Sequence, residues 1–203
     1  PEPYRRGVAG VSTSNPRITH LAFHPDGVRL LVASHRATVS MWNVESGDLL
    51  RHYRVGTWVQ GIAASPDGGG FALHTQPGRR YLWALEAEQP RRVVSRPPLG
   101  RGHDMGYDRA GLYLWSAGND RTLQRLDPRD DTVLRGRAGA EQHPHAPAVG
   151  RFSVHPGRGQ VAGVVEDRIG IWATETLLLE RFVDHAWGAG ATVTGAVYLP
   201  RRN

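Results

Sequence analysis

Two histidines that could bind a metal ion, His143 and His145, stand on either side of Pro144. They lie in the segment 138–149, which is rich in Pro, Ala and Gly. Two imidazoles at this spacing form a metal site only when another part of the chain supplies a third ligand. The sequence has no cysteine, so thiolate ligands and disulfides are excluded. A solvated loop is the simpler interpretation, and we predict no metal site and no cofactor.

Groups that could act as a nucleophile, a base or a phosphate cradle lack the neighbours that such chemistry needs. Ser12 follows Gly10 closely, but the second glycine of a nucleophile elbow is missing. The sequence contains no phosphate loop, dinucleotide fingerprint or EF-hand pattern. The carboxylate pairs Asp130/Asp131 and Glu86/Glu88 fall at predicted turns, where solvated charge is the usual state. We therefore predict that the chain is not an enzyme.

The 25 basic residues of the chain are all arginines, and the formal net charge is +6. Codon bias in a GC-rich genome explains the absence of lysine and indicates a bacterial source. The densest basic group falls on a predicted edge strand, where charge discourages aggregation between sheets. Its members are Arg91, Arg92, Arg96 and Arg101. Elsewhere Arg is scattered among Asp and Glu through every repeat, without the clustered stripe of a nucleic-acid interface. The charge therefore permits an acidic protein or peptide partner but does not favour nucleic acid.

Similar turns recur along the chain at an interval of 41 residues. Pro25-Asp26-Gly27, Pro66-Asp67-Gly68 and Tyr107-Asp108-Arg109 have this spacing, and Pro156 and Pro200 follow at longer intervals. Short apolar runs such as Leu21-Ala22-Phe23 precede these turns. A repeat of roughly 40 to 50 residues built from short strands is typical of a propeller blade, because one such unit cannot bury its own apolar face and must stack on neighbours.

Each repeat has the pattern of four short strands joined by tight turns. The predicted strands are 18–23, 28–34, 38–43 and 49–55; 59–64, 71–75, 80–83 and 91–95; 101–106, 112–117, 122–126 and 132–135; 150–154, 161–165, 169–172 and 177–183; and 193–199, which opens a fifth unit. We therefore predict an all-β fold of propeller blades, each with four antiparallel strands. About four blades are complete, and partial strands flank them.

The period and the strand pattern resemble those of the WD-repeat family of β-propellers over nearly the whole chain. The resemblance implies structural roles for residues at family positions: the third-strand tryptophans Trp42, Trp83 and Trp172, the following acid Asp127, the loop acid Asp120 and the histidine His145. Other repeats depart from the pattern, since Leu126 replaces the tryptophan and Asn43, Ala84 and Ala173 replace the acid. The family's His–Ser/Thr–Trp–Asp network is thus incomplete, and blade stability must rest on packing. We expect Trp42 and Trp172 to be buried between blades.

The repeats organise residues 1–203 as one WD-repeat-like propeller segment. The blades span approximately 18–56, 57–98, 99–139 and 148–185, and residues 192–203 form a partial blade. Residues 1–17 include Val8-Ala9-Gly10-Val11, which has the pattern of the last strand of a preceding blade. We favour an open arc from a longer propeller, because the chain starts without Met or a signal peptide; a small closed ring is the alternative. No apolar run is long enough to span a bilayer, and we expect a cytoplasmic location.

The resemblance implies an interaction module that presents loops to a protein or peptide partner. Loops between blades, and between second and third strands, gather on one face of a propeller and form the binding rim in WD-repeat proteins. Six residues occupy such loop-proximal positions when the repeats are aligned from their turns: Arg17, His35, Trp58, Gln60, Arg101 and Asn119. Trp58 is the principal candidate because Trp is enriched in interface hot spots, although a packing role fits it equally well.

Two other functions are compatible with a propeller. An enzyme-type propeller, such as a lactonase or a peptidase-associated one, needs Glu, Asp, Asn or His to converge on the axis. The first strands here carry mostly Thr, Ala, Gly and Val near the axis, which does not favour this alternative. The arc could also position a fused upstream catalytic domain, such as a kinase, protease or NTPase.

Overall fold

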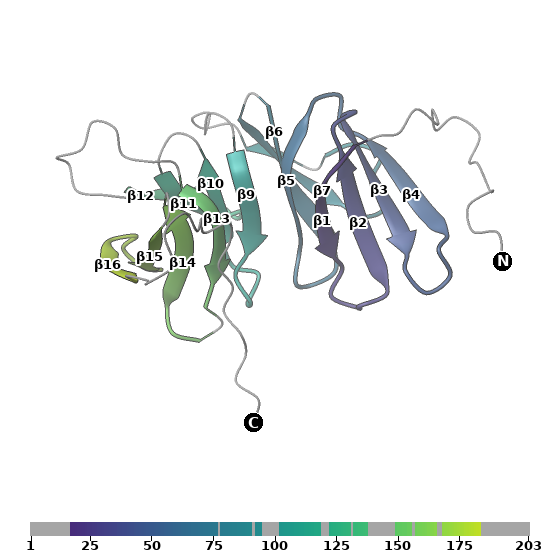
Figure 1. Ribbon diagram of the computed structural model, residues 1–203. Coiled ribbons are helices and arrows are strands. Elements are labelled where there is room, and N and C mark those ends of the chain that lie inside the picture. The colour runs from purple at the N-terminus through teal and green to yellow at the C-terminus, as the bar shows by residue number, and fades with distance from the viewer. Residues whose placement is uncertain are drawn as a thin grey trace, which may run out of the picture.

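The computed structural model describes residues 17–76, 78–90, 92–94, 102–118, 122–130, 132–137, 149–155, 157–165 and 168–183 (Figure 1). These residues form four antiparallel sheets of four strands, each sheet built from consecutive strands. The first sheet contains β1 (Ile18–Phe23), β2 (Arg29–Ser34), β3 (Thr38–Asn43) and β4 (Leu49–Arg54). The second contains β5 (Val59–Ala64), β6 (Gly70–Thr75), β7 (Arg79–Ala84) and β8 (Arg92–Val94). The third contains β9 (Gly102–Tyr107), β10 (Leu114–Gly118), β11 (Thr122–Leu126) and β12 (Val133–Arg137). The fourth contains β13 (Val149–Val154), β14 (Gln160–Val165), β15 (Arg168–Ala173) and β16 (Leu179–Val183).

The prediction of an all-β fold with antiparallel blades of four strands is confirmed, and the described residues contain no helix. The four sheets lie one after another in an arc (Figure 1). Their first strands meet in succession, since β1 contacts β5, β5 contacts β9 and β9 contacts β13. The strands expected in 1–17 and 192–203 lie outside the described residues, and the division into blades and partial blades stays a prediction. No helix in the described ranges is long and apolar enough to cross a membrane.

The turns between the first and second strands are held by the same hydrogen bond in three sheets. Gly27 N–H donates to the His24 carbonyl, Gly68 N–H to that of Ser65 and Gly111 N–H to that of Asp108. All three glycines have φ between 71° and 75°, a conformation that L-residues rarely adopt.

The turn of the third repeat corrects the alignment made from the sequence. Arg109-Ala110-Gly111, and not Tyr107-Asp108-Arg109, takes the place of Pro66-Asp67-Gly68, because Gly111 closes the turn and Tyr107 is the last residue of β9. The interval between the second and third turns is therefore 43 residues. Asp108 misled the alignment because it follows Tyr107 as Asp67 follows Pro66.

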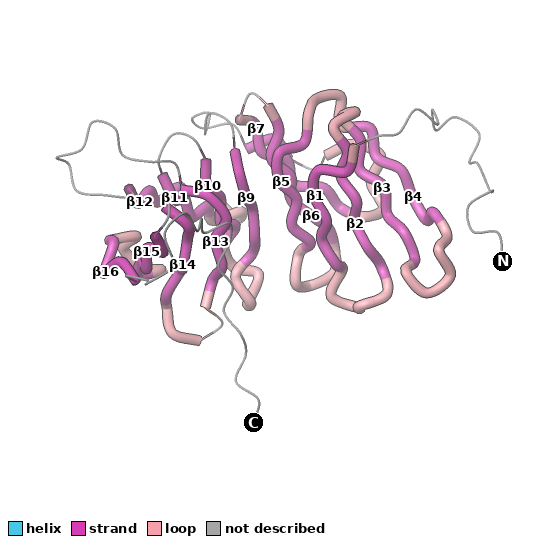
Figure 2. Tube along the Cα trace, viewed as in Figure 1, coloured by secondary structure: helices cyan, strands magenta, loops and turns pink. Residues whose placement is uncertain are grey.

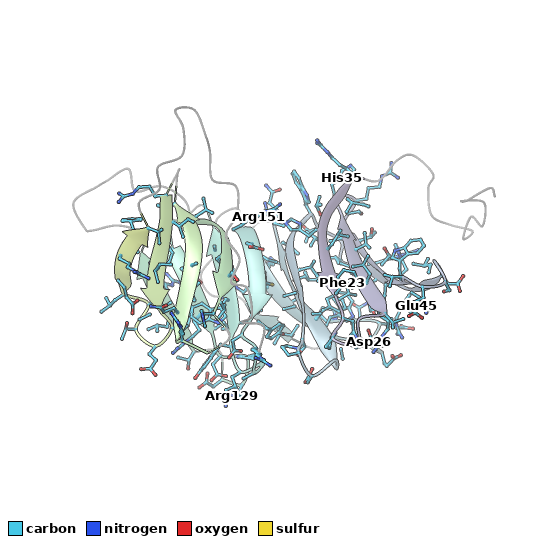
Figure 3. The ribbon with its side chains drawn as sticks, turned by 60° about the horizontal axis from the view of Figure 1, so that its bottom comes forward. Phe23, Asp26, His35, Glu45, Arg129 and Arg151 are labelled. Carbon is cyan, nitrogen blue, oxygen red and sulfur yellow. The ribbon has the colours of Figure 1, made fainter. Side chains whose placement is uncertain are left out.

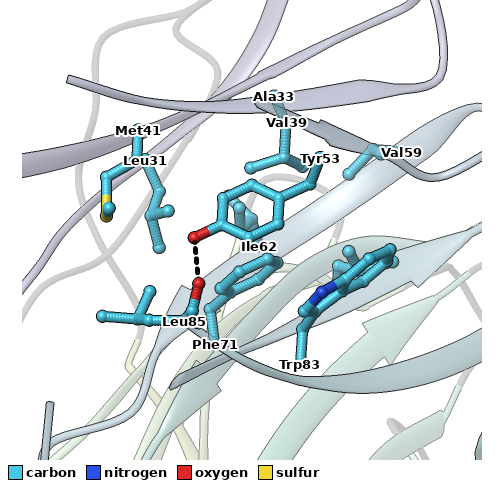
Figure 4. Packing of buried hydrophobic residues seen from close by; sticks show 11 residues of the cluster. Leu31, Ala33, Val39, Met41, Tyr53, Val59, Ile62, Phe71, Trp83 and Leu85 are labelled. Atoms are coloured by element: carbon cyan, nitrogen blue, oxygen red, sulfur yellow. Dashed lines mark hydrogen bonds between the residues drawn. The ribbon is translucent and has the colours of Figure 1, made fainter. Parts of the chain in front are cut away.

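An aromatic and aliphatic core joins the first sheet to the second (Figure 4). Phe71 and Trp83 are stacked with centroids 5.9 Å apart, and the Tyr53 ring meets both edge-on at 4.9 Å and 5.7 Å. The Tyr53 hydroxyl donates a 2.9 Å hydrogen bond to the Leu85 carbonyl. The polar end of a buried Tyr is thereby satisfied while its ring fills the space between the sheets.

The interface between the second and third sheets contains a buried polar group as well as apolar side chains. Arg80 of β7 donates to the side-chain carbonyl of Gln124 on β11, and Gln124 donates in turn to the Thr122 hydroxyl at 3.0 Å. Arg80 and Gln124 are both almost fully buried, as is His74 on β6. Met105, Leu114 and other apolar residues of these two sheets form a separate core cluster. A buried guanidinium needs such acceptors because removing its charge from water is costly.

Candidate functional site

Loops gather at two ends of the strands (Figure 2). The end where β1, β5, β9 and β13 begin carries the β2–β3 and β6–β7 loops and the connection between β4 and β5, and is here named the entry end. The opposite end carries the β1–β2 and β3–β4 turns and is named the turn end. His35 lies at the entry end, whereas Asp26, Glu45 and Arg129 lie toward the turn end (Figure 3).

Charged side chains are distributed unequally between the two ends. The turn end carries carboxylates together with Arg29, Arg109, Arg129 and Arg158, whereas the described entry-end loops carry arginines and no carboxylate. Described arginines of the entry end are Arg17, Arg36, Arg54, Arg79 and Arg168, all exposed. Acidic residues of the described turns lie at the turn end: Asp26, Glu45, Asp48, Asp67, Glu86, Glu88, Asp108, Asp127, Asp130 and Glu175. Asp120, Glu166 and Asp167 belong to loops between second and third strands but lie outside the described residues. The described part of the entry end is thus basic, although arginines and acids are interspersed along the chain.

Trp58 is an exposed side chain at the entry end, on a backbone that hydrogen bonds fix in place. Its side chain is 47% exposed, and it immediately precedes β5. The Trp58 carbonyl accepts the N–H of Gln76 at 2.9 Å, and the Thr57 hydroxyl donates to the Gln76 carbonyl at 2.6 Å. These bonds join two loops of the second sheet. An exposed indole on a fixed backbone can bind a partner without a large loss of backbone entropy.

Arg17 and His35 form the matching arrangement in the first sheet. The N–H of His35 donates to the Arg17 carbonyl at 3.1 Å, and His35 Nδ1 lies 3.2 Å from the same oxygen. Both side chains are exposed. The pairs Arg17/His35 and Trp58/Gln76 are therefore equivalent in the two repeats. Because β1 and β5 are in contact, the two pairs lie at the same end of neighbouring sheets.

The remaining candidates of the binding rim are placed only in part. Gln60 is half-buried as the second residue of β5. Arg101 and Asn119 lie outside the described residues. With the corrected turn, the sequence position of Arg101 is equivalent to Trp58, and not to Gln60 as the 41-residue interval implied; Asn119 is equivalent to Gln76. The use of these residues, and of the whole rim, for binding stays a prediction.

The inner strands bring His20 and Arg151 close enough to interact electrostatically, which sequence reasoning did not predict. His20, Gly61, Asp104 and Arg151 occupy the same position before the turn in the four repeats. Burial lowers the pKa of His20, and the positive charge of Arg151 lowers it further. Asp104 accepts the N–H groups of Met105 at 2.9 Å and Phe152 at 3.2 Å. The equivalence of the four positions could have been found from the repeat once the third turn was correctly placed.

At the turn end, polar groups serve the turns themselves. Asp26 accepts the N–H groups of Val28 and Arg29, each at 3.0 Å, and forms a 2.6 Å ion pair with the Arg29 guanidinium. The hydrogen bond from the Arg29 N–H is the main reason that the pKa of Asp26 is lowered. Buried His24 lies with Nε2 3.0 Å from the Gly68 carbonyl oxygen and thus links the turns of the first two sheets. These contacts are structural, and they explain the recurrence of Asp in the repeat.

The tryptophans at the family position differ in burial. Trp83 and Trp172 are buried, at 3% and 0% exposed, whereas Trp42 is only half-buried. Trp42 lies on the face of the first sheet that points away from the second sheet, and no described sheet covers it. Its burial between blades stays a prediction. The Trp42 indole donates to Ser40 of its own strand at 2.8 Å, and the Trp83 indole to the Ala87 carbonyl at 3.0 Å.

Asp127 has a local role at the β11–β12 turn. It accepts the Arg129 N–H at 2.9 Å and the Arg129 guanidinium at 2.8 Å, and these bonds lower its pKa to about 2. Asn43, at the equivalent position, accepts the N–H groups of Glu45 and Ser46. Both residues therefore cap the turn that follows the third strand. Asp120 and His145 lie outside the described residues, and their structural roles stay predictions.

The geometry of the described residues shows no arrangement suited to metal binding. No group of three His, Asp or Glu side chains in the described ranges could hold a metal ion. His143 and His145 are not among the described residues. On the described parts of the first strands, Asp104 is the one carboxylate, and both of its oxygens accept backbone N–H groups. A cluster of carboxylates of the kind an enzyme-type propeller needs is not seen on these strands.

Comparison with known proteins finds similarity to WD-repeat proteins in part of the chain. Residues 7–75 match the family profile of the anaphase-promoting complex subunit 4 WD40 domain. A stretch of 78 residues is 32% identical to the Protein LST8 homolog of Drosophila melanogaster. This stretch makes up 36% of the present chain and 24% of that protein. The chain thus spans about a quarter of the length of this relative. Both similarities support a relation to the WD-repeat family, whose domains generally mediate protein–protein interactions.

Proposed function

We propose that the chain is a non-catalytic scaffold that binds an acidic protein or peptide segment at its entry end. The observation that carries this proposal is the exposed Trp58 on a fixed backbone, at the same end of the strands as a set of exposed arginines. An aromatic anchor with cationic surroundings suits a partner that offers both apolar and acidic side chains. The general role of WD40 domains in protein–protein interaction supports the same function.

Charge on the entry end supports an acidic partner in particular. Arg17 and Arg54 are exposed there, whereas the described turns at the opposite end carry the carboxylates. Complementary charge raises the rate of association and selects the docking orientation more than it raises affinity. We therefore expect partner binding to weaken as the salt concentration rises, mainly through slower association.

A displayed peptide library tests the proposal, because it offers the chain partner segments of every composition. Peptides selected against the chain are expected to be enriched in Asp and Glu. The affinity of a selected peptide is then measured for the chain and for Trp58→Ala, Arg17→Ala and the double variant. Trp58→Ala is expected to weaken binding by about 2 kcal/mol, roughly thirtyfold, as for an interface hot spot.

Leu178→Ala is the matched control, because Leu178 is an exposed apolar side chain at the turn end. It should leave peptide binding unchanged, and none of the substitutions should lower the melting temperature by more than a degree or two. Selected peptides that lack acidic residues, or that bind the Trp58→Ala/Arg17→Ala variant as tightly as the unchanged chain, would contradict the proposal. So would a hydrolytic activity of the purified chain that a substitution on the inner strands abolishes.

A further inference from the structure

The first strand of each sheet has one edge that no strand of its own sheet covers. These edges of β1, β5, β9 and β13 meet in succession and are here named the inner edge (Figure 1). N–H groups along an antiparallel strand point alternately toward the paired strand and away from it. The N–H groups of His24 and Ser65, directly after β1 and β5, donate to carbonyls of β2 and β6. Those of Leu21 and Ile62, three residues earlier, therefore point to the inner edge.

The equivalent N–H groups of the third and fourth sheets bind a carboxylate. Met105 N–H donates to one oxygen of Asp104 at 2.9 Å, and Phe152 N–H donates to the other at 3.2 Å. Asp104 thereby joins the inner edges of β9 and β13. Hydrogen bonds from backbone N–H groups to an oxyanion are charge-assisted and stronger than those to a neutral acceptor. Two consecutive first strands can thus hold an oxyanion between them at this register.

The first and second sheets have the same N–H groups but no carboxylate beside them. His20 and Gly61 stand at the position of Asp104. A β-bulge directly precedes this position in β1, β5 and β9, and bulges redirect the side chains next to them. No described side chain accepts the N–H groups of Leu21 and Ile62. The donors of the Asp104 site therefore recur between β1 and β5 without its acceptor.

Two side chains favour an anion beside these N–H groups. His20 is half-buried, and its buried Nδ1 makes no hydrogen bond to the described residues. Arg151, at the equivalent position of β13, is exposed and close enough for its charge to lower the pKa of His20. Of the strands packed against β1, β5 carries no titratable side chain, and β2 carries only Arg29, at its turn end. The charge that acts on His20 is therefore positive.

We propose that the inner edge of β1 and β5 binds an oxyanion of a small molecule, a carboxylate or a phosphate, through the N–H groups of Leu21 and Ile62 and the side chains of His20 and Arg151. The N–H groups hold its oxygens as the third and fourth sheets hold the Asp104 carboxylate. Arg151 supplies the positive charge, and the His20 ring donates a further hydrogen bond. The bound anion raises the pKa of His20, because a negative charge favours the imidazolium form. Binding therefore strengthens as the pH falls through the pKa of His20.

NMR titration of the isotope-labelled full chain tests the proposal. The probes are acetate, and sulfate as a stand-in for phosphate that does not itself titrate near neutral pH; sodium chloride at equal ionic strength controls for screening. The amide resonances of Leu21 and Ile62 are expected to move downfield, whereas those of Met105 and Phe152, which already bind a carboxylate, stay in place. The pKa of His20 is expected to rise by about one unit, which corresponds to roughly tenfold tighter binding to the imidazolium form.

Two arginine variants separate the site from a general effect of charge. Arg151→Gln is expected to abolish the response to both probes, whereas Arg158→Gln, which removes an exposed arginine at the turn end of the same sheet, keeps it. Trp58→Ala should keep it as well, so loss of peptide binding and loss of anion binding are distinct results. Unmoved amide resonances on β1 and β5, or an equal rise of the His20 pKa in sodium chloride, would overturn the proposal. A response that Arg151→Gln retains would overturn it too.

Discussion

The first and second junctions between sheets use the same strand arrangement but are filled in different ways. The first junction holds the ring cluster of Tyr53, Phe71 and Trp83. The second holds the buried pair of Arg80 and Gln124 as well as an apolar cluster. The repeat therefore dictates where sheets meet, but not which kind of interaction joins them. Dispersion and apolar burial stabilise the first junction, whereas the second depends on satisfying a buried charge.

Removing the central ring of the first junction should have the largest effect. Trp83→Ala is expected to lower the free energy of unfolding by about 3–5 kcal/mol, because a buried indole leaves a cavity that its neighbours cannot fill. Urea denaturation followed by circular dichroism measures the change. Trp42→Ala is the matched control, at the equivalent but half-buried position, and should lower it by about half as much. Equal losses for the two variants would contradict the difference in burial.

Removing the acceptor of the second junction should have an intermediate effect. Gln124→Leu deprives the Arg80 guanidinium of a buried carbonyl, and a hydrogen bond to a charged group contributes about 1.5–3 kcal/mol. Urea denaturation of the single variant Gln124→Leu and of the double variant Arg80→Met/Gln124→Leu measures the change in the free energy of unfolding. The double variant should be the more stable of the two, because it has no buried charge left to satisfy. A double variant less stable than Gln124→Leu would show that Arg80 itself stabilises the junction.

Tyr53→Phe separates ring packing from hydrogen bonding within the first junction. The substitution keeps the ring contacts and removes the hydroxyl that donates to the Leu85 carbonyl. We expect a loss of about 1 kcal/mol in the free energy of unfolding, well below that of Trp83→Ala. Thermal unfolding by calorimetry is the measurement. A loss as large as that of Trp83→Ala would mean that the first junction, like the second, depends chiefly on a polar contact.

The smallest effect concerns His20, near the axis that both junctions surround. Burial and the charge of Arg151 hold the pKa of His20 below 6.5 in the folded chain. Between that pKa and 6.5 the unfolded chain binds more protons, so His20 makes stability fall as the pH falls through this window and has no influence above it. Proton NMR titration should show the low pKa and a rise toward 6.5 in Arg151→Ala. An unchanged pKa in that variant would mean that Arg151 does not lie near His20.

The strands were predictable from the sequence because they depend on local patterns. Alternating apolar residues and tight turns located β1, β3, β5 and β11 to the residue and the others within a few residues. The sequence misplaced the third turn because Tyr107-Asp108-Arg109 follows Pro66-Asp67-Gly68 at the repeat interval of 41 residues and has Asp at the same position. Its true position rests on the Gly111 N–H bond to Asp108, and Arg109-Ala110 lacks the Pro-Asp signature.

The candidate site was only partly predictable. The exposure of Trp58 could not be read from the repeat, since the sequence left a packing role and a binding role equally compatible. For Trp42 the sequence was less ambiguous than for Trp58, because the repeat pattern predicts a buried residue there. Its actual burial, however, depends on whether a neighbouring sheet covers it. Arg80 gave no signal at all, because an arginine next to Arg79 on a strand has the pattern of an exposed charge.

The repeat, the four-stranded sheets and their order along the chain follow from the sequence alone. These features depend on contacts between residues close in sequence, where turn geometry and strand alternation act directly. The gathering of the described turn carboxylates at one end arises only in the tertiary structure, since alternate turns of an up-and-down sheet fall at alternate ends. The tertiary structure also selects which equivalent apolar positions are buried, because burial between sheets depends on residues about 40 positions away that pack across each junction.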